Sequence, residues 1–138
     1  MKPTIYLSNW SSHKTPGHHG PGRKYTIMVR PRRWEHGEGC IYQLMPRSAD
    51  LAELRSNDIS ADDYFDRFRR LMSGWGGELS PGRLMAASRC ARFQRPVEDG
   101  DTGCCSCARG KPCHRRIAAE FLHAAGWRVM LDGEEWSP

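Results

Sequence analysis

The amino-acid sequence predicts an α/β fold, a small three-layer sandwich with a mainly parallel, Rossmann-like central sheet and flanking helices. The main observation is the order strand, turn, helix, glycine, strand over residues 102–131. Such a crossover is right-handed and joins parallel strands. The second observation is the length of 138 residues, which suits one hydrophobic core. We therefore expect a single domain over residues 1–138.

The first third of the chain predicts three short strands and a long loop. The strands are expected at residues 4–8, 25–29 and 40–45, and a proline follows each of the last two. Residues 9–24 form a basic stretch rich in glycine, proline and histidine. Loops of this length are commonly functional or disordered.

The middle of the chain predicts three helices. Ser48 is a candidate N-cap for residues 49–54, and Ser60 is one for residues 61–71. A third helix is expected over residues 80–93, because Ser80 and Pro81 resemble a helix start. Apolar residues recur at helical spacing in the second helix, which indicates core packing; they are Tyr64, Phe65, Phe68, Leu71 and Met72.

The last third contains the crossover. Residues 102–106 are small and uncharged, as in a buried strand, and residues 114–125 have one apolar side, as in a helix. Gly126 is expected to end that helix, and residues 127–131 form the last strand before an Asp132–Gly133 turn.

Composition narrows the function classes. The net charge of +5 favours anionic partners. No apolar run is long enough to cross a bilayer, and the first residues lack the apolar core of a signal peptide. We expect a cytoplasmic protein with no membrane partner and no cofactor. Of its six cysteines, Cys104, Cys105, Cys107 and Cys113 lie within ten residues, which favours a metal, catalytic or anion site over structural disulfides.

The turn from Cys104 to Arg116 is the predicted working site. Ligands of open α/β sheets lie beyond the carboxyl ends of the strands, where the next helix presents unpaired N–H groups. A thiol at such a helix start has its thiolate favoured by the helix dipole and nearby cations, so Cys113 is the candidate for a lowered pKa. His114 is a candidate acid, base or donor.

The site residues also resemble a known family. The pattern consists of Cys105, seven intervening residues and then Cys113-His114-Arg115. It is similar to the signature of the domain of unknown function 488 family, in which a cysteine ends a strand before a Cys-His-Arg helix start. The resemblance implies a compact α/β domain whose cysteines are suspected of activity. It marks Cys105, Cys113, His114 and Arg115 as site residues.

The first interpretation of the site is binding. A nucleotide or another phosphorylated small molecule would lie on the helix start, with Trp10 or Trp34 stacking on a base and residues 9–24 closing as a lid. A related possibility is a module that grips the phosphates of nucleic acid. The candidate binding residues are Arg115, Arg116, Lys111, Arg109, Trp10, Ser8 and Arg23.

Three other interpretations stay open. Cys113 or Cys105 is a nucleophile or redox thiol of an enzyme acting on a nucleotide or nucleoside, with His114 moving a proton and Arg115 steadying an oxyanion. Alternatively, Cys105, Cys107 and Cys113 bind zinc in a nucleic-acid-binding module. In the last interpretation Cys104 and Cys107 are buried strand residues, and Arg115 pairs with a carboxylate such as Glu120.

Overall fold

The computed structural model describes residues 1–35, 37–88, 92–106 and 113–138, which include a five-stranded sheet. Its strands are β1 (Thr4–Asn9), β2 (Lys24–Thr26), β5 (Thr102–Cys105), β6 (Arg128–Leu131) and β7 (Glu134–Glu135). They lie in the order β2-β5-β1-β6-β7. The first four are parallel, and β7 runs antiparallel to β6. The mainly parallel sheet confirms the predicted α/β class.

The predicted crossover is present. Helix α3 (His114–Ala124) joins β5 to β6, and these two strands pair with opposite sides of β1. Gly126 has a φ of +112°, which a glycine adopts most readily, and it ends the helix as predicted. The β6–β7 turn is formed by Asp132 and Gly133, both with positive φ, a combination that matches the twist of the flanking strands.

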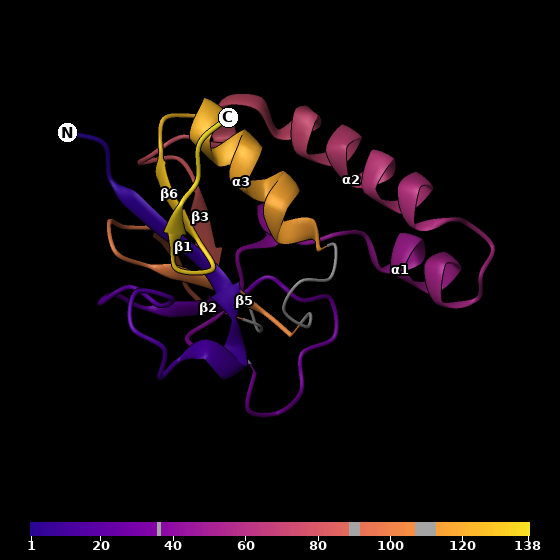
Figure 1. The fold of residues 1–138 in the computed structure, drawn as a ribbon, viewed down its shortest axis with the longest axis horizontal. Helices are drawn as coiled ribbons and strands as arrows, with labels where there is room; N and C mark the ends of the chain where they lie inside the picture. The colour runs from indigo at the N-terminus through magenta and orange to yellow at the C-terminus, as the bar shows by residue number, and fades with distance from the viewer. Residues whose placement is uncertain (36, 89–91, 107–112) are drawn as a thin grey trace.

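The helices lie together on one side of the sheet (Figure 1). Helix α3 contacts β1 and β6, helix α2 (Ala61–Trp75) packs on α3, and α1 (Ser48–Arg55) packs on α2. Ser60 starts α2 with the predicted cap, since its Oγ accepts from the Asp63 amide at 3.1 Å. The apolar stripe of α2 packs in or against the core as predicted.

Residues 10–23, which we call the strap, pack on the other face of the sheet at Gly20, which lies against Tyr6 and Thr102. The strap begins with a 3-10 helix at Trp10–Ser12. Farther along, the Gly20 amide donates to Thr102 Oγ1 at 2.9 Å and the Gly22 amide donates to Gly100 O at 3.0 Å. Helices, sheet and strap give a small three-layer sandwich.

The strand predicted at residues 40–45 is wrong. Cys40 forms isolated bridges with Thr26 and Ala87, outside any named strand, and residues Tyr42–Leu44 form a 3-10 helix. Strand β2 is likewise shorter than predicted, although the amide of Ile27 still donates to Cys104 O at 2.9 Å. The apolar side chains within Cys40–Met45 therefore indicate burial and not a strand. Ile41 and Leu44 are fully buried.

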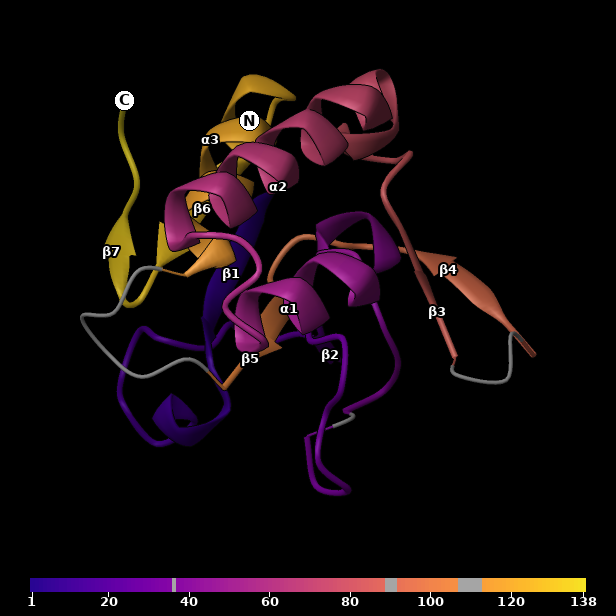
Figure 2. The ribbon, with the colours of Figure 1, turned by 90° about the vertical axis from the view of Figure 1, so that its right-hand side faces the viewer.

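The helix predicted over residues 80–93 is also wrong at residues 80–88 and 92–93, the part of it that the structure describes. Gly82 has a φ of +83°, which ends any helical turn after Ser80, and the chain continues as β3 (Met85–Ala87) and β4 (Gln94–Pro96). These strands form a separate antiparallel pair at one end of the molecule (Figure 2). Pairing with Cys40 and burial of Leu84 and Ala86 outweigh the helical propensity of this segment.

Two smaller observations complete the fold. Helix α1 starts one residue earlier than predicted, with Arg47 rather than Ser48 at its N-cap. Among the described residues, each helix is too short or too polar to span a bilayer. A cytoplasmic location remains a prediction.

Candidate functional site

The predicted site is built around two adjacent thiols. Cys105 is the last residue of β5, and Cys113 is the N-cap of α3. Their sulfur atoms are 3.5 Å apart, and the residues are 1% and 5% exposed. Both side chains belong to the core on the helical face of the sheet. We call Cys105, Cys113, His114 and Arg115 the thiol cluster.

Arg115 contacts Cys105 rather than an open surface. Its Nη1 donates to Cys105 Sγ at 2.7 Å, and its Nη2 donates to Asp132 Oδ2 at 3.0 Å. Burial by itself lowers the pKa of Arg115, but the two cysteines and Asp132 more than offset this and raise it above its usual value. Arg115 is therefore a buried cation whose charge faces a thiol and a carboxylate.

His114 is held in one tautomer. Its Nε2 is 3.1 Å from Ile27 O, and because a carbonyl can only accept, Nε2 carries the proton. Burial lowers the pKa of His114, so the ring is neutral and Nδ1 has a lone pair. That nitrogen lies 3.6 Å from Cys113 Sγ. The contact between neighbouring residues is possible because Cys113 is extended (φ −145°, ψ 150°) and not yet helical.

A small pocket opens beside the thiol cluster. Its volume is about 120 Å³, well below the ~300–1,000 Å³ that encloses a whole drug-sized ligand. Arg30 and Arg55 are exposed at this pocket, and neither makes an ion pair with another described residue. We call it the arginine–thiol pocket. It is lined by Met28, Val29, Arg30, Pro46, Leu51, Arg55, Tyr64, Cys105, Ser106 and His114.

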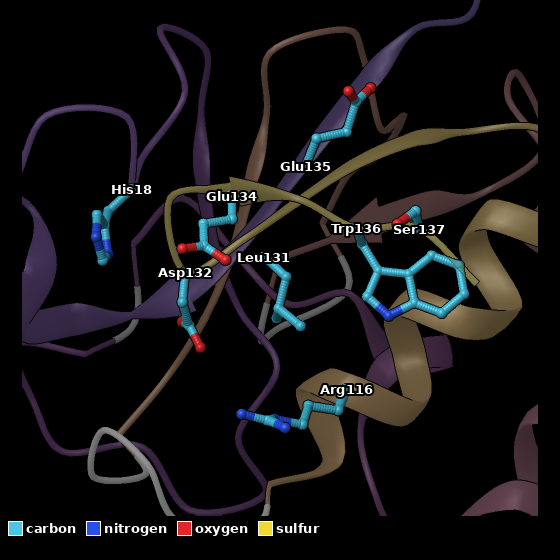
Figure 3. Close-up of a pocket in the computed structure, with 8 residues that line it drawn as sticks. All are labelled: His18, Arg116, Leu131, Asp132, Glu134, Glu135, Trp136 and Ser137. Carbon is cyan, nitrogen blue, oxygen red and sulfur yellow. The ribbon is translucent and has the colours of Figure 1, made fainter.

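Arg116 lies away from this pocket. It borders a larger hollow between α3 and the β6–β7 hairpin, where Figure 3 shows it opposite the hairpin residues. Glu134, Glu135 and Asp132 also border that hollow, and His18 of the strap lies at its edge. This hollow carries more carboxylates than cations, which does not suit an anion.

Ser8 of β1 and two strap residues, Trp10 and Arg23, are predicted to bind ligand and also lie elsewhere. Ser8 is fully buried, with its Oγ 3.5 Å from Nδ1 of His18. Arg23 is ion-paired with Glu38 at 3.7 Å. Trp10 is 8% exposed and borders a separate hollow with Lys24 and Trp34. The strap lies on the sheet in this structure, and its closing as a lid stays a prediction.

Three predicted site residues, Cys107, Arg109 and Lys111, lie outside the described residues. Among the residues that are described, no three histidine, cysteine or acidic side chains are grouped as metal ligands would be. Cys104 is a fully buried strand residue. Since neighbouring strand residues point to opposite faces, its side chain lies on the strap side, away from Cys105.

Sequence reasoning missed three residues at the site. Arg30 follows the predicted strand 25–29, and Asp132 follows strand β6. Because parallel strands end at the same edge of a sheet, both could have been placed beside Cys105 from the sequence. Arg55 ends α1, and no local signal connects it with the thiol cluster. The carboxylate predicted for Arg115 is Asp132 rather than Glu120, which pairs with Arg69.

Fold and site together define a small α/β protein with two thiols, an arginine and a histidine at the carboxyl edge of a parallel sheet. In comparisons with known proteins, no family model, curated protein or solved structure matches the chain. The resemblance to the domain of unknown function 488 family stays a prediction.

Proposed function

We propose that this protein binds a small phosphorylated or otherwise anionic molecule in the arginine–thiol pocket and that Cys105 is its nucleophile. The observation that carries the proposal is the shared lining of one pocket by Cys105 and by two exposed arginines, Arg30 and Arg55. Arginine is the side chain best suited to phosphate and carboxylate oxygens. The proposed site therefore takes its cations from Arg30 and Arg55. The sequence instead predicts Arg115 and Arg116 for this role.

The size of the pocket limits the substrate. A volume of about 120 Å³ admits an anionic head group, such as a phosphoryl or carboxylate group, but not a whole nucleotide. The rest of a nucleotide would lie outside the pocket, over the exposed arginines. The proposed class is therefore defined by the head group, and nucleotides are one member of it.

The chemistry proposed for Cys105 follows from its buried neighbour. The guanidinium of Arg115 donates to Cys105 Sγ, and a hydrogen-bonding cation stabilises a thiolate relative to a thiol. A thiolate is the reactive form in nucleophilic catalysis. The protein would then be a cysteine-dependent enzyme that acts on an anionic substrate.

Alkylation by iodoacetate and iodoacetamide tests this proposal directly. The two reagents deliver groups of similar size, but only iodoacetate is an anion. We expect iodoacetate to modify Cys105 faster than iodoacetamide at low salt, with the preference lost in the double variant Arg30→Gln/Arg55→Gln and reduced by inorganic phosphate. High salt should also weaken the preference, because exposed charges are screened. Peptide mass spectrometry locates the modified cysteine.

The matched control is Arg70→Gln, which removes an exposed arginine from a different hollow. It should leave the reagent preference unchanged. Anion binding at this pocket would be excluded if iodoacetamide modified wild-type Cys105 faster than iodoacetate did and the double variant showed the same ratio of the two rates.

A second candidate function is the binding of single-stranded nucleic acid at another place. Trp34 is 62% exposed, and it borders a hollow of about 480 Å³ with Trp10, Lys24, His13 and Ser11. Exposed aromatic rings beside cations are the features on which unpaired bases stack. An oligonucleotide should quench tryptophan fluorescence in a salt-dependent manner, and Trp34→Ala should abolish the effect. Unquenched fluorescence at low salt would exclude this candidate.

A further inference from the structure

The sulfur atoms of Cys105 and Cys113 are already in contact. They are 3.5 Å apart, so closing a disulfide of ~2.05 Å needs an approach of about 1.5 Å. The two residues come from different elements, the end of β5 and the N-cap of α3. Core packing therefore holds the sulfurs together although seven residues separate them in the sequence.

Each sulfur has a different polar partner suited to one step of thiol–disulfide exchange. Arg115 Nη1 donates to Cys105 Sγ at 2.7 Å, which favours an attacking thiolate there. His114 Nδ1 lies 3.6 Å from Cys113 Sγ and can take its proton, because Nε2 is occupied by Ile27 O. Cys105 also lines the arginine–thiol pocket, whereas Cys113 is not among the lining residues.

We propose that Cys105 and Cys113 form a dithiol–disulfide couple that reduces small organic disulfides. This activity goes beyond the proposed anion binding, because it depends only on the two thiols and their partners. Cys105 is the attacking thiol and Cys113 is the resolving thiol. Cys105 is assigned the first attack because it lines the pocket, whereas Cys113 is not among the lining residues.

The reaction balances in two exchange steps. Cys105 first releases its proton to solvent, and the thiolate attacks one sulfur of a disulfide RSSR. A Cys105–SR bond forms and the S–S bond of RSSR breaks. The first RS⁻ leaves and takes up a proton from solvent. Cys113 then passes its proton to His114 Nδ1 and attacks the Cys105 sulfur. The Cys105–Cys113 bond forms, and the second RS⁻ leaves with the proton from His114. RSSR is reduced to two RSH, and the protein dithiol is oxidised.

The experiment uses the reduced full-length protein and bis(2-hydroxyethyl) disulfide, a neutral reagent whose reaction does not depend on anion binding. After an acid quench, remaining thiols are blocked with N-ethylmaleimide and peptides are mapped by mass spectrometry. We expect a cross-linked peptide containing Cys105 and Cys113, and a corresponding loss of two maleimide-reactive thiols. A failed anion-binding test would leave this result unaffected.

Two cysteine variants separate the steps. Cys113→Ser should stop at a mercaptoethanol adduct on Cys105, and Cys105→Ser should form neither adduct nor cross-link at this pair. His114→Gln should slow the second step by more than about tenfold while leaving the first step intact, since proton removal controls thiol reactivity. Cys104→Ser is the control, and it should behave like the wild type.

Two results would overturn the proposal. One is a cross-link from Cys105 to another cysteine, such as Cys107, in place of Cys113. The other is an identical mercaptoethanol adduct on Cys105 in the wild type and in Cys113→Ser, with no cross-link in either. Circular dichroism of each variant shows that the fold is retained, so that a missing cross-link is not a consequence of unfolding.

Discussion

The guanidinium of Arg115 bridges the sulfur of Cys105 and the carboxylate of Asp132, with Nη1 at 2.7 Å from Sγ and Nη2 at 3.0 Å from Oδ2. Cys105 ends β5, and Asp132 lies in the turn after β6. Arg115 is 2% exposed, whereas Arg116, the next residue, is exposed. One arginine therefore ties together the carboxyl ends of two strands that flank β1, and its neighbour faces solvent.

Replacing Arg115 should destabilise the protein more than replacing Arg116. Arg115→Met keeps much of the side-chain length but leaves Asp132 without its partner, and we expect the free energy of unfolding to fall by about 2–4 kcal/mol. Arg116→Met should change it by less than about 0.5 kcal/mol. Urea denaturation followed by circular dichroism measures both values, and equal effects would show that the Arg115 bridge contributes no specific stability.

The part of the fold that could be predicted best is the β5–α3–β6 crossover. Its elements have strong local signals: the small residues of 102–105, the apolar side of α3 and Gly126. The incorrect predictions concern segments whose structure depends on hydrogen bonds to a distant part of the chain. Residues 80–93 have the composition of a helix, but Ala87 exchanges hydrogen bonds with Cys40, more than forty residues away in the sequence. The periodicity of apolar residues in the sequence gives no information about a pairing between residues so far apart.

The candidate site could be located from the sequence, but its contacts could not. The sequence predicts that Cys105 lies with residues 113–116. The sulfur atoms of Cys105 and Cys113 are indeed 3.5 Å apart, whereas Arg116 borders a different hollow. The orientation of Arg115 toward Cys105 and Asp132 depends on three elements meeting at one sheet edge. For the same reason, the sequence does not predict that Arg30 and Arg55, which come from other elements, line a pocket with Cys105.

The unfolding free energy should depend on pH through His114. Burial lowers the pKa of His114 below its ordinary value of 6.5. Below about pH 6.5 the unfolded chain therefore binds a proton that the folded protein does not, and the folded state loses stability as the pH falls. The loss for one such group is at most about 1.4 kcal/mol per pH unit. It should be visible between about pH 7 and pH 5.

His114→Gln is the variant that tests this dependence, because the Gln amide is still a hydrogen-bond donor but does not titrate. Its unfolding free energy, measured by urea denaturation, should fall less steeply between about pH 7 and pH 5 than that of the wild type. His19, whose pKa is also lowered by burial, accounts for a remaining slope. Parallel curves for the wild type and His114→Gln would contradict a neutral His114 in the folded state.

Cys104 and Cys105 should differ sharply in reactivity although they are neighbours. Burial raises the pKa of Cys104 to about 12, so only about one molecule in ten thousand carries its thiolate at about pH 8. Iodoacetamide should therefore modify Cys105 and spare Cys104 in the folded protein. Both should react at similar rates in concentrated guanidinium chloride. Peptide mapping after short exposures distinguishes them, and early modification of Cys104 in the folded protein would contradict its complete burial.

The strap should be sensitive to a single methyl group at Gly20. A Cβ at this position would lie 2.1 Å from Gly100 O and 2.4 Å from Tyr6 Cδ1, so the strap would have to move away from the sheet. We expect Gly20→Ala to lower the free energy of unfolding by about 1–3 kcal/mol. Amide hydrogen exchange should also become faster in the strap, because the Gly20 amide would lose its bond to Thr102.

Gly74→Ala provides the matched control for the same substitution. Gly74 lies in α2, and a Cβ there would meet no atom within 4 Å. Alanine in a helix is more favourable than glycine, so Gly74→Ala should raise the free energy of unfolding by about 0.5–1 kcal/mol. The two substitutions are thus expected to act in opposite directions in the same urea denaturation experiment. A Gly20→Ala protein as stable as Gly74→Ala would mean that the strap does not pack on Tyr6 in solution.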